Sequence, residues 1–209
     1  MTAEQRRAIG RYRRKAAGYD ASAERTMPLR RRTIALLALQ PGQTVLDAGA
    51  GTGLSYALLR DGVGSSGRVL AVEQSPEMFA LAEARVQREG WANVWHKLAA
   101  ADSVLLPLPA DAVLFNFTHD ILRSTAALDN LLRQARPGAR IAVCGMKFFP
   151  WWTGPLNLLP WLKNRPYNAR VGELWRPWSL LKPRCRAWQQ WTVLGGMGYV
   201  ACGTLATPR

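Results

Sequence analysis

The chain of 209 residues is long enough for one domain with a full hydrophobic core, and 48% of its residues are hydrophobic, as in ordinary soluble globular proteins. No apolar run reaches the roughly 18 residues that a membrane span needs, and residues 1–15 lack the apolar stretch of a signal peptide. The cysteines Cys144, Cys185 and Cys202 match neither a disulfide framework nor a CxxC metal motif. We therefore expect a cytoplasmic protein without a metal site.

The net charge of +14 is concentrated towards the two ends of the sequence. Residues 1–32 contain ten Lys/Arg and three Asp/Glu, and residues 147–209 contain nine Lys/Arg and one Asp/Glu, whereas residues 33–146 are nearly neutral. Basic flanks favour an anionic partner, such as a nucleic acid, a phospholipid surface or an acidic substrate. A generally basic, solubilising surface explains the same pattern, so both interpretations stay open.

In chain order, the first expected elements are a basic helix over residues 3–17 and a second helix over 28–39, which Pro41-Gly42 ends. The run TVLDAGAGTG (44–53) then indicates a buried strand that passes into a tight glycine turn. A helix is expected over residues 54–59.

The pattern of alternating strand and helix continues through the middle of the chain. After a strand over residues 68–73, a helix is expected over 75–88, because Ser75 is a good N-cap and Pro76 suits the first helical turn. The remaining elements of this part are strands near 93–98 and 111–117, a helix over 124–135, a turn at Arg136-Pro137-Gly138 and a fifth strand over 139–145.

The last part of the chain departs from this alternation. Residues 147–187 contain six prolines and five of the nine tryptophans, which predicts a partly irregular cap over one end of the sheet. Residues 188–209 contain two apolar runs around Gly195-Gly196, which indicate a terminal β-hairpin. Together with a basic helical segment (1–40) and a core (41–146), these make one domain over residues 1–209. The expected fold is α/β, a doubly wound and mostly parallel sheet with an antiparallel C-terminal hairpin.

The strongest signal for a site is the loop from Asp47 to Gly53, which lies between a predicted strand and a predicted helix. Its glycines let a ligand approach the backbone at the carboxyl ends of the strands. A dinucleotide loop has a third glycine where this chain has Leu54, and the charge of Asp47 would repel a pyrophosphate. The loop therefore favours a ligand with a positive group, such as an amino-acid ammonium.

Two further carboxylates follow neighbouring strands. Glu73 could accept two hydrogen bonds from the vicinal hydroxyls of a ribose, although an NAD site uses the same device. Asp102 could accept a hydrogen bond from the amino group of an adenine.

Four segments in order, VLDAGAGTG, AVEQSPEMFALA, AADSVLLPLPADAVLFNF and ALDNLLRQARPGARIAVCG, resemble the class I S-adenosylmethionine-dependent methyltransferases, in particular the small-molecule branch that includes quinone and phospholipid methyltransferases. The resemblance covers residues 33–146 and, more loosely, the terminal hairpin. It implies a seven-stranded, Rossmann-like domain whose core, residues 41–146, binds S-adenosyl-L-methionine.

The resemblance also implies which residues contact each part of this cofactor. In chain order they are Tyr19 (closing over the cofactor), Asp47, Gly49, Gly51 and Gly53 (methionine part), Glu73 (ribose), Gln74, Met78, Ala101 and Asp102 (adenine), and Asn116 and Phe117 (methyl group). Core packing is an alternative role for Met78 and Phe117, and a simple turn is an alternative for the glycines.

The chemistry at the methyl group needs mainly alignment of the acceptor and exclusion of water, because the sulfonium is already a strong electrophile. A hydroxyl or an acidic carbon usually needs a base as well. His119, with Asp120 beside it, follows the fourth strand and is the candidate for a base or an acceptor-orienting residue. A histidine that only bonds to the backbone is the alternative.

The acceptor favoured by the sequence is a small hydrophobic or lipid-like molecule. We expect a pocket beyond His119 that is lined by tryptophans of the cap and rimmed by its basic side chains, namely Trp151, Trp152, Trp161, Trp175 and Trp178, with Arg165, Arg170, Arg176, Lys182, Arg184 and Arg186. Such a composition suits peripheral contact with an anionic membrane.

Two other functions stay open. An RNA methyltransferase would use the basic flanks to bind phosphates, although no appended RNA-binding module is recognisable and residues 116–119 lack the Asn/Asp-Pro-Pro-aromatic motif of enzymes that methylate amino groups of nucleic-acid bases. A non-catalytic cofactor-binding protein is the third candidate. The sequence does not indicate an oligomeric state.

Overall fold

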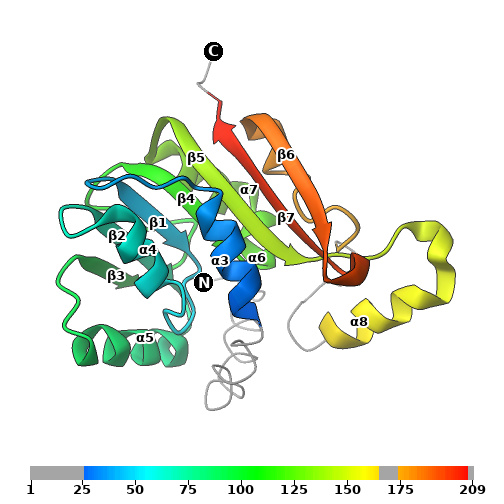
Figure 1. Cartoon of the computed structure of the whole chain (residues 1–209), viewed down its shortest axis with the longest axis horizontal. Coiled ribbons are helices and arrows are strands. Elements are labelled where there is room, and N and C mark those ends of the chain that lie inside the picture. The colour runs from blue at the N-terminus through cyan, green and yellow to red at the C-terminus, as the bar shows by residue number, and fades with distance from the viewer. Residues whose placement is uncertain (1–25, 165–173, 207–209) are drawn as a thin grey trace.

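The computed structural model of the protein describes residues 26–164 and 174–206 (Figure 1). The helix expected over residues 3–17 lies outside this range. In the described part, no helix is both long enough and apolar enough to pass through a bilayer.

A seven-stranded sheet organises the fold, in the order β3-β2-β1-β4-β5-β7-β6. Its strands are β1 (Thr44–Ala48), β2 (Arg68–Glu73), β3 (Val94–Leu98), β4 (Ala110–Asn116), β5 (Ala135–Met146), β6 (Cys185–Val193) and β7 (Gly198–Leu205). The first five strands are mutually parallel, whereas β7 pairs antiparallel with both β5 and β6. The predicted α/β sheet with an antiparallel terminal hairpin is confirmed.

Helices cover both faces of the sheet, so alternate residues of each central strand are buried on opposite sides. On one face Val45 of β1 packs in a cluster with residues of α3 (Met27–Ala35), α4 (Tyr56–Val63) and α5 (Pro76–Arg88). On the other face Leu46 of β1 packs in a cluster with Leu128 and Leu131 of α7 (Thr125–Arg133). Nearly continuous apolar strands are therefore what this fold requires.

Several boundaries differ from the sequence-based prediction. α4 begins at Tyr56, because the preceding residues form the turns of the glycine loop. The four-residue α6 (His119–Leu122) is too short to show a helical period. Arg136-Pro137-Gly138 lies inside β5, where the pairing with β4 shifts from Ala110↔Ala135 to Ala112↔Arg140. It is an irregularity within a strand and not a turn before one.

The segment expected to form a cap divides into two parts. After β5, the 3-10 helix η2 (Trp151–Asn157) and α8 (Leu158–Asn164) project away from the sheet, in yellow in Figure 1. The short η4 (Lys182–Arg184) leads into β6, which begins at Cys185 and so takes three residues that we expected in the cap. A single turn, η5 (Leu194–Gly196), joins β6 to β7.

Candidate functional site

The strand order places a pocket at the carboxyl ends of the central strands. The chain runs outward in opposite directions from β1 and β4, so the loops that follow these neighbouring strands diverge and leave a crevice between them. A pocket of about 730 Å³, counting space open to solvent, lies there. Its walls come from the loops after β1, β2, β3 and β4, together with α3 and α5.

Backbone geometry explains the two glycines that line this pocket. Gly49 has a φ of 76°, donates its N–H to Val72 O at 2.9 Å, and leaves no room for a side chain, because a Cβ would lie 2.5 Å from Cγ2 of Thr118. Gly51 has a φ of 60°, and among the described residues no atom other than those of its chain neighbours lies within 4 Å of the position a Cβ would take. The loop therefore presents bare backbone to the pocket at Gly51. Gly53 packs against the ring of Tyr56 and does not line the pocket.

Glu73 is held rigidly at the end of β2. Its Oε2 accepts a hydrogen bond from the N–H of Gly51 and its Oε1 accepts one from the N–H of Ser75, both at 2.8 Å. Burial raises the pKa of the Glu73 carboxyl, and hydrogen bonds from the backbone oppose the rise. The N–H of Gln74 also bonds to this carboxylate, which has about four lone-pair sites, so Glu73 can still accept a hydrogen bond from a ligand in the pocket.

Asp47, at the start of the glycine loop, is buried and feels the positive charge of Arg30. Asp47 is 1% exposed, and its Oδ2 has no hydrogen-bond partner among the described residues. Burial raises the pKa of Asp47 to about 7, the charge of Arg30 acts against this rise, and that of Glu73 adds to it. Asp47 does not line the pocket, but Arg30 does.

Arg30 is a site residue that the sequence reading missed. Its Nη1 donates to Oγ of Ser55 at 3.3 Å, and its guanidinium lies 5.6 Å from the centre of the Phe117 ring. It belongs to the run Arg30-Arg31-Arg32 of the basic N-terminal flank, for which the sequence leaves open an anionic partner or a solubilising surface. The signal that could have found it is the helical period, because Arg30 lies on the same face of α3 as the buried Thr33 and Ile34.

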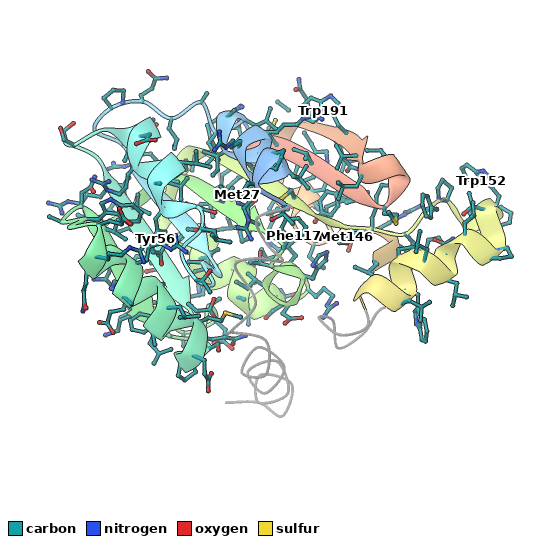
Figure 2. All side chains as sticks on the ribbon, turned by 60° about the horizontal axis from the view of Figure 1, so that its bottom comes forward. Met27, Tyr56, Phe117, Met146, Trp152 and Trp191 are labelled. Carbon is teal, nitrogen blue, oxygen red and sulfur yellow. The ribbon has the colours of Figure 1, made fainter. Side chains whose placement is uncertain are left out.

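The carboxyl end of β4 turns sharply at Phe117. Phe117 has a φ of 59°, which is uncommon for a bulky residue, and its N–H donates to Cys144 O at 2.9 Å. Asn116 is fixed on both sides, because its Nδ2 donates to Oγ of Ser55 at 3.3 Å and its Oδ1 accepts from Sγ of Cys144 at 3.0 Å. Asn116 and Phe117 both line the pocket. Figure 2 shows Phe117 close to the end of β5, marked by Met146.

His119 and Asp120 begin α6 and also line the pocket. Nε2 of His119 lies 3.0 Å from the carbonyl oxygen of Met146, to which it donates in the tautomer that carries the hydrogen on Nε2. Burial lowers the pKa of His119 to about 4, although the backbone hydrogen bonds with Met146 and Phe117 oppose the shift. The imidazole is therefore neutral near pH 7. A carboxylate oxygen of Asp120 pairs with Nη2 of Arg123 at 2.9 Å.

The other predicted cofactor residues divide into two groups. Gln74, Met78 and Ala101 line the pocket, on the side of the loops after β2 and β3. Asp102 is exposed on the turn next to Ala101 and is not part of the pocket wall. Tyr19 lies outside the described residues.

The prediction that tryptophans of the cap line this pocket is wrong for the described residues. None of them is part of its wall. Trp178 packs on Tyr199, with ring centres 4.8 Å apart, and Trp151 and Trp152 are 77% and 71% exposed. Arg184, expected at the rim, pairs with Asp129 at 2.7 Å. The physical reason is that η2 and α8 run outward from the end of β5, away from the strand ends that carry the pocket (Figure 1). Arg165 and Arg170 lie outside the described residues.

Comparisons with known proteins find methyltransferases. A family model described as protein-L-isoaspartate(D-aspartate) O-methyltransferase matches residues 16–105. A protein-L-isoaspartate O-methyltransferase of Aeropyrum pernix is 34% identical over 145 residues, 68% of this chain and 51% of the relative. A demethylmenaquinone methyltransferase of Beutenbergia cavernae is 36% identical over 127 residues, 58% of this chain and 48% of the relative. The chain thus spans about half the length of these two relatives.

A solved structure supports the fold. A SAM-dependent methyltransferase from Aquifex aeolicus superposes with a TM-score of 0.63 at 24% identity, covering 85% of this chain and 89% of the other. At this identity the likeness establishes the arrangement of the sheet and helices and leaves the acceptor open.

Proposed function

Because the chain is a member of the class I S-adenosylmethionine-dependent methyltransferase superfamily, we propose that it transfers a methyl group from S-adenosyl-L-methionine to a small hydrophobic or lipid-like acceptor. The observation that carries the cofactor part of the proposal is the carboxylate of Glu73, fixed beside the exposed backbone of Gly51 in one pocket at the carboxyl ends of the strands. The two relatives named above carry the names of different acceptors, so similarity does not choose between acceptors for this chain.

The polar groups around the pocket fit the three parts of this cofactor. Glu73 would accept hydrogen bonds from the ribose hydroxyls. Arg30 would pair with the carboxylate of the methionine part, and the negative charge of Asp47, which lacks a hydrogen-bond partner at Oδ2, would favour its ammonium. Gln74 and Met78 would flank the adenine, and Asp102 would reach the adenine amino group only after the turn that carries it moves inward.

The residues at the end of β4 would act on the acceptor side. When bound, the cofactor supplies an electrophilic methyl group on a positively charged sulfur. Asn116, fixed by Ser55 and Cys144, and the ring of Phe117 would border that methyl group and exclude water from it. We propose that His119, with Asp120, orients the acceptor, because a buried imidazole with a pKa of about 4 is a weak base.

The first test of the proposal uses the acceptor's chemistry. S-adenosylmethionine labelled in its methyl group is incubated with the protein and either a lipid extract or total RNA of the source organism. We expect label in the organic phase of the lipid reaction. Label in RNA alone would favour the second candidate, an RNA methyltransferase, which the excess of Lys/Arg over residues 147–209 supports.

The charge state of His119 provides a second test. The chain contains only His96 and His119, so ring-carbon NMR resolves both imidazoles, and a His96→Gln variant assigns them. We expect the His119 signal to stay that of a neutral ring from pH 8 down to about pH 5, since its pKa is about 4. A His119 midpoint between pH 6 and 7 would contradict this and restore the role of general base.

The role of Arg30 predicts a selective loss of affinity. In Arg30→Lys we expect the Kd for S-adenosylmethionine to rise about tenfold, because lysine keeps the charge but loses the planar fork that pairs with a carboxylate. Binding of 5′-methylthioadenosine, which has no carboxylate, should change less than about twofold. Arg31→Lys, on the exposed side of the same helix, is the control. An equal loss for both ligands would assign Arg30 a structural role only.

A further inference from the structure

The arm formed by η2 and α8 (residues 151–164) carries a concentration of exposed apolar side chains. Trp151 and Trp152 are 77% and 71% exposed, and their rings meet edge to face at 6.3 Å. The other large apolar side chains that the arm exposes are Leu156, Leu158, Leu159, Trp161 and Leu162. Figure 2 shows Trp152 at the far end of the molecule from Tyr56, on the arm itself. An exposed cluster of this size marks a surface that binds something apolar.

The polar side chains of Thr153 and Asn157 form hydrogen bonds within the arm. Oγ1 of Thr153 donates to Pro150 O at 2.7 Å, and Nδ2 of Asn157 donates to Oγ1 of Thr153 at 3.3 Å. Both bonds lie within the arm's own turn. The residues of the arm described as exposed are tryptophans, leucines, a glycine and a proline, whereas a water-facing helix exposes polar groups.

The charge of the sequence that contains the arm indicates the chemistry of its partner. No acidic residue occurs from Lys147 to Gly172, and residues 147–209 contain nine Lys/Arg against one Asp/Glu. A second copy of the chain seated on this surface would bring the same positive charge against it, which is unfavourable. An anionic phospholipid surface offers both negative headgroups and an apolar layer for tryptophan and leucine.

The position of the arm also suits a membrane-dissolved acceptor. The arm follows the carboxyl end of β5, which is parallel to β1 and β4, so it leaves from the edge of the sheet that carries the pocket. A bilayer that binds the arm would then lie near the carboxyl ends of the strands, where the pocket is.

We propose that the arm docks the protein on anionic phospholipid bilayers by inserting Trp151, Trp152 and Leu156 into the interfacial layer. The biological purpose of this contact rests on the proposed function, since it would deliver a lipid-like acceptor to the pocket. The binding itself needs no cofactor.

The test is sedimentation of the full chain with vesicles of phosphatidylglycerol or of phosphatidylcholine. The arm variant is Trp151→Ser/Trp152→Ser/Leu156→Ser, and the matched control is Leu105→Ser/Leu108→Ser, whose leucines are also exposed but lie between β3 and β4. We expect the arm variant to lose affinity for phosphatidylglycerol vesicles by about tenfold or more, and the control by less than about twofold. Wild-type binding should weaken with added salt and be weaker on phosphatidylcholine.

Two outcomes would overturn the proposal. The first is an arm variant that binds phosphatidylglycerol vesicles as tightly as the wild type. The second is a wild-type dimer that becomes monomeric in the arm variant, since a second copy would then cover the arm. Thermal melting checks that each variant is folded. Titration with S-adenosylmethionine in the absence of vesicles separates the two hypotheses, because vesicle binding without cofactor binding would refute the proposed function and leave the docking surface intact.

Discussion

Replacement of Glu73 by alanine is expected to raise the Kd for S-adenosylmethionine about 30- to 150-fold, which corresponds to roughly 2–3 kcal/mol. The variant lacks the carboxylate that would accept hydrogen bonds from the ribose hydroxyls. The N–H groups of Gly51 and Ser75 would also lose their acceptor. Both effects lower the affinity of the pocket for S-adenosylmethionine. Isothermal titration calorimetry measures the change, and NAD should not bind to either protein.

The control for this prediction is Glu89→Ala. Glu89 follows the end of α5, pairs with its neighbour Arg88 at 2.8 Å and is outside the pocket wall, so its removal should leave the affinity within about twofold of wild type. An unchanged Kd in a folded Glu73→Ala protein would refute the assignment of Glu73 to the ribose.

The second large effect is expected from Asp47→Asn, and it depends on pH. The pKa of Asp47 is about 7 in the folded protein and near 3.8 in an unfolded chain, so the folded state binds this proton more tightly. The stabilisation from the protonated carboxyl is therefore complete below about pH 4 and is lost as the pH rises through about 7. An asparagine carries no charge and avoids that loss.

We therefore expect Asp47→Asn and the wild type to have similar free energies of unfolding at pH 4, and the variant to be more stable at pH 8 by up to about 4 kcal/mol. The same variant should bind S-adenosylmethionine more weakly at pH 8, because it lacks the charge that favours the ammonium group. Urea unfolding at the two pH values measures the first effect, with Asp61→Asn on the exposed side of α4 as control. If the difference in the free energy of unfolding is the same at both pH values, the prediction is wrong, because other groups then offset the cost of burying the charged Asp47 carboxylate.

Much of the architecture follows from local patterns in the sequence. Apolar runs such as Val45–Leu46 and Val69–Leu70 predict strands buried on both faces, and the structure contains them there. Ser75 predicts the start of a helix, and its Oγ does accept from the N–H of Met78 at 3.5 Å. The glycines at 49 and 51 predict a backbone that a ligand can approach. These features depend on nearby residues only, so the sequence is sufficient to find them.

Other features depend on contacts between distant parts of the chain. Arg30 reaches the pocket because α3 packs beside Ser55 and Phe117, 25 and 87 residues further along the chain, and Arg31 next to it stays exposed. Trp178 is partly buried and packs against the core, whereas Trp151 and Trp152 are exposed, although all three lie in one tryptophan-rich segment. The buried and the exposed residues of each kind have the same type and similar spacing in the sequence. The tertiary structure decides which of them is buried, because burial of an arginine or a tryptophan depends on which surface the fold brings against it.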